Sequence, residues 1–245
     1  MLIQTQNKGK KKIHYGWIVA IGGFLTQAIL LIGTSTLPLV LTAFERSLGI
    51  SNAGAGLVIS VYGLFYVIGA PVWGVIVDRI GLRKALTSSS LLASVGVFSM
   101  GATSSLSTCL IIYALIGFGS AALITLIPKI TGLWFDMRKK GVASSFITSG
   151  GVVSASILGV LVPLLTISYN WRAPFYAFGS ISLFFSIIIY AIVRNNPHEK
   201  GLALLGAKQK AAETLMADQE DKVKAKDVIQ MGVTWHFAAF YIFFI

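Results

Sequence analysis

The chain has 245 residues, of which 55% are hydrophobic and 12% are charged, and its formal net charge is +11 at pH 7. A soluble domain carries about 25% charged residues, so this composition excludes an ordinary soluble domain and favours a membrane protein. The single cysteine, Cys109, excludes an internal disulfide and a multi-cysteine metal site. We expect neither a metal nor a cofactor.

Six apolar runs follow one another along the chain. A membrane-crossing helix needs about 20 apolar residues, and a helix satisfies its own backbone hydrogen bonds in lipid. The first run is too long for the apolar region of a cleaved signal peptide, which has about 7–15 residues. The sequence therefore predicts an all-α polytopic membrane protein with a six-helix bundle over residues 17–194. The runs cover residues 17–41, 56–77, 85–103, 108–134, 142–166 and 173–193.

Polar segments flank this bundle. Residues 1–16 form a basic N-terminus, and residues 195–231 are predicted to be a central loop rich in Lys, Glu, Asp, Ala and Gln. Residues 232–245 begin a seventh apolar run, which stops after about 14 residues, too few to cross a bilayer. This pattern predicts a seventh transmembrane helix that is truncated.

Basic residues predict the orientation of the bundle. Most of the 20 lysines and arginines lie in segments that six crossings would place on one side, whereas Arg46 and Arg172 lie on the other. Loops rich in Lys and Arg face the cytoplasm. We therefore expect a cytoplasmic N-terminus and central loop, in the plasma (inner) membrane. The positive charge then reflects topology, and nucleic acid is not an expected partner.

Two segments about 90 positions apart are similar. LPLVLTAFERS begins at Leu37 and IPKITGLWFDMR begins at Ile127, so that Pro38 and Pro128 align. Each segment ends the first helix of a three-helix group, on opposite sides of the membrane. Such a match is typical of an inverted three-plus-three repeat, although chance similarity between two membrane helices is the alternative.

Charge is concentrated between the second and third runs, in the segment WGVIVDRIGLRKALT that begins at Trp73. Gly74 allows another helix to approach closely, and Gly81 allows a tight turn. Asp78 can face the positive N-terminal end of a neighbouring helix. The alternative is that these charges only set topology. The positions of interest are Gly74, Asp78, Arg79, Gly81, Arg83 and Lys84.

This spacing resembles the loop motif of the major facilitator superfamily: Gly, three residues, an acid, a base, one residue, Gly, one residue and two bases. The segments WFDMRKKGVASSFITSGG from Trp134, NWRAPF from Asn170 and NPHEKG from Asn196 are also similar to that family. The resemblance covers about residues 14–245. It implies the N-terminal half of a secondary active transporter that works by alternating access, with the C-terminal half missing.

The resemblance also implies roles for particular residues. Asp78 would cap a helix of the second half in the outward-open state and so form a cytoplasmic latch, and Asp136 and Arg138 would join its charge network. HYGWIV from His14, together with the WF pair at Trp134 and the basic run that follows, is similar to the oxalate/formate and monocarboxylate porter branch. This similarity points to a small organic anion, such as a monocarboxylate, as the substrate.

In that family a cavity at mid-depth is lined by the first, second, fourth and fifth helices of this half. Gln27 and Thr34 share one helix face. For every candidate, a role in helix packing is the alternative to substrate contact. Lys129 lies inside the fourth run, where it either snorkels to the cytoplasmic surface or contacts an anion. The candidates near mid-depth are Gln27, Thr34, Tyr62, Tyr66, Ser120 and Ser154, with Lys129 closer to the surface.

The expected partners are a small-molecule substrate, which a coupling ion could accompany, the lipid bilayer and the missing C-terminal half. An intramembrane serine protease built on Ser149 is disfavoured, because no base is expected near that hydroxyl. We therefore do not expect an enzyme. The other alternative is a truncated fragment or scaffold that does not transport. Residues 1–245 alone are not expected to transport, because half a cavity has nothing to rock against.

Overall fold

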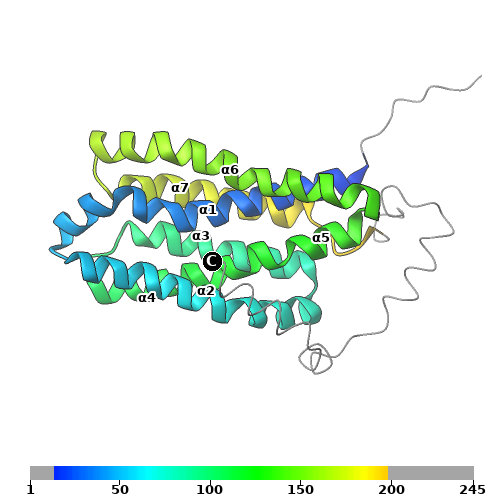
Figure 1. Cartoon of the computed structure of the whole chain (residues 1–245), viewed down its shortest axis with the longest axis horizontal. Helices are drawn as coiled ribbons and strands as arrows, with labels where there is room; N and C mark the ends of the chain where they lie inside the picture. The colour runs from blue at the N-terminus through cyan, green and yellow to red at the C-terminus, as the bar shows by residue number, and fades with distance from the viewer. Residues whose placement is uncertain (1–13, 198–245) are drawn as a thin grey trace, which may run out of the picture. The chain divides into compact units, whose positions relative to one another are not determined.

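The computed structural model describes residues 14–197, all of which belong to one compact unit. Within this range there are seven helices and no strand, and Figure 1 shows the long helices running along a common direction as a bundle. The expected central loop, apart from its first residues, and the expected seventh helix lie outside the described residues, as do residues 1–13. The helices are α1 (Tyr15–Leu48), α2 (Asn52–Ile80), α3 (Leu82–Met100), α4 (Leu106–Thr125), α5 (Ile127–Trp134), α6 (Met137–Ser168) and α7 (Ala173–Ile192).

All six predicted runs are helical, which confirms the all-α fold, but several helices extend beyond the apolar residues. Polar side chains cap the first turns of three of them. His14 Nδ1 accepts from Gly16 N–H at 3.1 Å before α1, and the hydroxyls of Ser51 and Ser105 do the same before α2 and α4. Such caps satisfy backbone donors that have no partner within the helix.

Five segments of the described chain are long and apolar enough to cross a membrane. Helix α3 falls short of this apolar character, although it forms where the third run was predicted. Its serines lower the hydropathy, and several of them face protein. Ser89 and Ser90 are buried, and their hydroxyls donate to the carbonyl of Leu86. The spanning segments are Tyr15–Leu48, Asn52–Ile80, Leu106–Trp134, Met137–Ser168 and Ala173–Ile192.

Glycines bring the helices close together. Helix α1 packs along α6, and α2 packs along α4. A Cβ atom on Gly150 would lie 2.2 Å from the carbonyl oxygen of Phe24, and one on Gly117 would lie 2.3 Å from that of Tyr62. Small residues allow this backbone approach inside membranes, where dispersion contacts rather than the hydrophobic effect hold helices together.

The helix pairs agree with an inverted repeat. If α4 and α5 count as one segment, the bundle has six segments in two groups of three. When each segment of the first group exchanges with its counterpart in the second, the packed pair α1–α6 becomes the packed pair α4–α2. The exchange maps the packed pair α3–α7 onto itself. The two aligned prolines differ, however. Helix α1 continues through Pro38, whereas α4 ends at Thr125 and α5 restarts with Pro128 in its first turn, where the missing N–H costs nothing.

Candidate functional site

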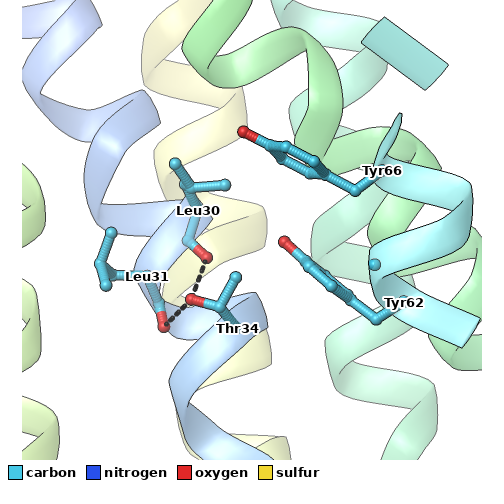
Figure 2. A pocket seen from close by; sticks show the side chains of 6 residues that line it. Leu30, Leu31, Thr34, Tyr62 and Tyr66 are labelled. Atoms are coloured by element: carbon cyan, nitrogen blue, oxygen red, sulfur yellow. Dashed lines mark hydrogen bonds between the residues drawn. The ribbon is translucent and has the colours of Figure 1, made fainter. Parts of the chain in front are cut away.

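A pocket of about 270 Å³ lies between α1 and α2. Figure 2 shows Tyr62 and Tyr66 extending from α2 with their hydroxyl groups directed toward α1. The two rings are stacked, with centroids 6.0 Å apart and planes inclined by 20°. The stacked rings form one wall of a pocket whose other wall is helix α1. The lining residues are Leu30, Leu31, Thr34, Tyr62, Gly63 and Tyr66.

The polar groups of this pocket are few. Thr34 donates its hydroxyl to the carbonyls of Leu30 and Leu31 at 3.1 and 3.3 Å, as Figure 2 shows. The Tyr62 hydroxyl is buried beside the Ser120 hydroxyl, and neither reaches hydrogen-bond geometry with a partner within residues 14–197. No lining residue is charged. The described wall therefore offers aromatic and aliphatic surface, with the Tyr62 hydroxyl buried beside Ser120.

The other mid-depth candidates lie between helices and do not line this pocket. Gln27 is buried and donates its Nε2 to the carbonyl of Leu123 at 3.1 Å, which joins α1 to α4. Ser154 donates its hydroxyl to the carbonyl of Ala28 at 3.3 Å, which joins α6 to α1. Buried polar side chains form such bonds between membrane helices. Thr34, Tyr62 and Tyr66 are the predicted residues that the pocket brings together, and a role in substrate binding stays a prediction for all of the candidates.

Gly63 belongs to the pocket but was not among the predicted residues. A Cβ atom at this position would meet no atom within 4 Å. A glycine inside a helix costs about 1 kcal/mol relative to alanine, so its presence signals a packing or functional reason. That cost was the available signal, but the many glycines of this chain made it weak.

The acid of the loop motif forms an ion pair. Lys129 Nζ on α5 lies 2.5 Å from Asp78 Oδ1 on α2. The Asp78 side chain is 72% exposed and that of Lys129 is 35% exposed. Neither alternative considered for Lys129 included this partner, which lies 51 positions away in the sequence. Lys129 is thus directed to the loop motif and does not line the pocket.

The two glycines of the motif differ in their surroundings. A Cβ atom on Gly74 would meet nothing within 4 Å, and Asp78 lies one turn further along the same face of α2. This face is therefore open among the described residues. Gly81 links α2 to α3 with φ of +84°, in the left-handed region that favours glycine, so it makes the predicted turn.

The remaining charges of the motif divide into exposed and packed ones. Arg79 and Lys84 are exposed, whereas Arg83 contacts the end of α7 through Tyr190 and Asn195. Within residues 14–197 the one salt bridge is that between Lys129 and Asp78. Asp136 and Arg138 therefore form no ion pair in this range. Their part in a charge network therefore stays a prediction.

Aromatic rings join the segments that suggested a transporter branch. Trp17 meets Phe135 edge-on, with ring centroids 5.5 Å apart, and it meets Phe146 in the same way at 5.9 Å. Tyr15 packs against Trp134 at 5.6 Å. The start of α1 is thus held against the end of α5 and the first half of α6, at the end of the bundle that carries the loop motif.

Ser149, the serine of the disfavoured protease alternative, forms a hydrogen bond within its own helix. The Ser149 hydroxyl donates to the carbonyl of Phe146 on its own helix at 2.7 Å. No group of three or more His, Cys, Asp or Glu side chains that could hold a metal ion occurs among the described residues.

Comparison with known proteins decides the family. The family model described as Major Facilitator Superfamily matches residues 23–245. The chain belongs to the Major Facilitator Superfamily. The relatives of this chain are transporters and not enzymes. Its fold is the fold of such transporters.

Relatives in the superfamily carry different substrate names. The probable galactarate/D-glucarate transporter GarP of Escherichia coli (strain K12) is 23% identical over 202 residues, 80% of this chain and 45% of that protein. The multidrug resistance protein MdtG of Rahnella sp. (strain Y9602) is 32% identical over 197 residues, 75% of this chain and 44% of that protein. The chain thus spans less than half the length of these relatives.

A solved structure has the same fold. It is a bacterial homolog of the human lysosomal transporter Spinster in an inward-facing and unoccupied conformation. The TM-score is 0.68 at 17% identity, over 83% of this chain and 47% of that one. The superfamily fold of the bundle, as an N-terminal half, is therefore confirmed. With its several apolar helices, the chain is an integral, multi-pass membrane protein.

Proposed function

We propose that this protein is the N-terminal half of a secondary active transporter that moves a small organic anion across the plasma (inner) membrane by alternating access. The pocket between α1 and α2 is the observation that carries the proposal. Transporter substrates bind near mid-depth at the interface between structural repeats. The stacked rings of Tyr62 and Tyr66 would contact the substrate on this side, and the second half would complete the cavity.

Two observations support an anion. The HYGWIV and WF segments resemble the oxalate/formate and monocarboxylate porter branch, and Trp17 packs against Phe135 where the two segments meet. Galactarate and D-glucarate, which the name of GarP gives as its substrates, are carboxylates. The six residues that line the described pocket carry no charge. The cation that pairs with a substrate carboxylate would then come from the second half.

The loop motif supports the alternating-access part of the proposal. With the N-terminus in the cytoplasm, Asp78 lies at the cytoplasmic end of α2. Its open face, which also carries Gly74, would receive a helix of the second half and close the cytoplasmic side. The Lys129 ammonium beside Asp78 would hold the carboxylate in position. Loss of this contact would change the balance between inward and outward states without abolishing substrate binding.

Uptake into proteoliposomes tests the proposal. The full gene product is reconstituted and offered labelled pyruvate, oxalate and galactarate, with glucose as the uncharged control. We expect saturable uptake of at least one anion and none of glucose. Saturable uptake of glucose alone would refute the anion assignment. Absence of uptake and of exchange for the whole panel would refute it as well.

A further inference from the structure

Two helix ends meet beside the loop motif, and one of them supplies the cap that the other lacks. The residue before α3 is Gly81, which has no side chain, so α3 has no side-chain cap of its own. Asn195, which follows α7, accepts a hydrogen bond from Arg83 N–H through its Oδ1 at 2.9 Å. The first N–H groups of a helix have no partner within it. Asn195 therefore caps α3 from 112 positions away.

Arg83 caps the other helix in return. Its Nε donates to the carbonyl of Tyr190 in the last turn of α7 at 2.9 Å. Its guanidinium carbon lies 4.1 Å from the centroid of the Tyr190 ring. The last carbonyls of a helix have no partner within it, and a cation is favoured at this end of the helix dipole. Stacking on an aromatic face adds to this attraction. The last turn of α7 and the first turn of α3 thus cap each other.

This reciprocal contact defines the turn of the motif. A Cβ atom on Gly81 would lie 2.8 Å from Asn195 Oδ1, so the asparagine fills the space that a side chain would need. Gly81 also has a φ of +84°, and it follows Asp78 by three residues. Asn195, which follows α7, thus packs against the turn by which the chain leaves α2.

We infer that Asn195 and Tyr190 are positioning residues of the loop motif. Together they hold the turn from Gly81 to Arg83, and so keep Asp78 where the cytoplasmic latch requires it. This inference rests on the proposed function. Without the contact, the latch closes less well and the protein populates the inward-open state more. The pocket between α1 and α2 contains neither residue, so substrate affinity in the open state is unchanged.

The chain offers a matched control. Asn170 Oδ1 accepts from the N–H groups of Arg172 and Ala173 at 2.9 and 3.1 Å, at the start of α7. This is the same capping chemistry at the opposite end of the same helix. Asn170→Ala therefore removes a cap without touching the loop motif. Asn195→Asp keeps an acceptor oxygen for Arg83 N–H and serves as the conservative replacement.

Sided labelling of a cysteine placed in the pocket tests the inference. Thr34→Cys is introduced into the full gene product with Cys109→Ser, and a membrane-impermeant maleimide is applied from each side of proteoliposomes. Asn195→Ala is expected to raise the labelling rate from the cytoplasmic side about three- to tenfold, the shift that loss of one ordinary hydrogen bond gives. Tyr190→Leu should act in the same direction. Asn195→Asp and Asn170→Ala should keep the parent rate, although Asn170→Ala lowers thermal stability about as much as Asn195→Ala.

The following results count against the inference. If Asn195→Ala is labelled like the parent, or if Asn170→Ala shows the same rise, the contact does not position the latch. If Asn195→Ala does not assemble, Asn195→Ser and Tyr190→Leu carry the same test. If the parent carrying Thr34→Cys is labelled from neither side, or from one side only, the pocket does not alternate, and the inference falls together with the proposed function. If the parent alternates and the variants are labelled like the parent, only the inference is refuted and the proposed function stands.

Discussion

Lys129 Nζ and Asp78 Oδ1 form a salt bridge that joins the short helix α5 to the end of α2. Helix α5 begins after the interruption of the fourth span at Leu126 and carries Lys129 in its first turn. The far end of α5 is held by aromatic contacts between Phe135 and Trp17. The loop motif is thus connected through α5 to the start of α1.

Removal of this salt bridge should change the conformational balance more than the stability. An exposed ion pair contributes about 0–1 kcal/mol, and Asp78 is largely exposed. We expect Lys129→Ala and Asp78→Asn each to lower the turnover of transport severalfold, with unfolding free energies within about 1 kcal/mol of the parent. Uptake rates and thermal unfolding measure the two effects.

The exposed lysine Lys139 provides the control for this change. Lys139→Ala should leave turnover unchanged. The double variant of Lys129 and Asp78 should lose no more than Asp78→Asn alone, because Lys129 acts through its contact with Asp78. Additive losses would show that the two side chains act separately.

Gly150 should tolerate no side chain. In Gly150→Ala the Cβ atom would lie 2.2 Å from the carbonyl oxygen of Phe24, so α6 must move away from α1. Overpacking of this kind costs about 1–3 kcal/mol or more. Gly159 on the same helix meets nothing within 4 Å, so Gly159→Ala should be neutral or slightly stabilising. Thermal unfolding in detergent compares the two, and equal melting temperatures would contradict the close packing.

Gly63 should set the size of the pocket. In Gly63→Val the Cβ atom meets no neighbour, so the fold should persist, while the added side chain occupies space in a pocket of about 270 Å³. We expect the KM for a six-carbon dicarboxylate to rise about tenfold and that for a two-carbon acid to change less, as steric exclusion predicts. Gly56→Val, at another open position of α2, is the matched control. An equal effect of both variants would argue against a substrate pocket here.

The Tyr62 hydroxyl should contact the substrate. It is buried beside the Ser120 hydroxyl but outside good hydrogen-bond geometry, so its removal costs at most one weak contact within the described residues. Tyr62→Phe should therefore keep its melting temperature and raise KM about five- to tenfold, the effect of losing one hydrogen bond to substrate. Tyr176→Phe on α7, away from the pocket, should change neither quantity. An unchanged KM with increased stability would show that the hydroxyl only packs between helices.

Several features of the site could be predicted from sequence because they depend on local chemistry. The helices followed from the apolar runs, since a backbone in lipid must form its own hydrogen bonds. The turn at Gly81 followed from its position between two charged helix ends. Tyr62 and Tyr66 lie on one helix face, as a spacing of four residues requires, although the stacking of their rings was not predicted. The pocket between the rings and α1 did not follow, because it depends on how far apart two helices lie.

Sequence alone determined that this protein is a bundle of membrane helices with a charged turn of defined spacing, because length, apolarity and local spacing suffice for such conclusions. Only the tertiary structure decided which distant groups meet. It paired Lys129 with Asp78 and Asn195 with Arg83, and it placed Gln27 against Leu123 rather than in the pocket. These contacts depend on the rotation and separation of each helix about its neighbours. Close packing at residues such as Gly150 and Gly117 decides that geometry. The periodicity of a single helix does not predict which helix will pack there.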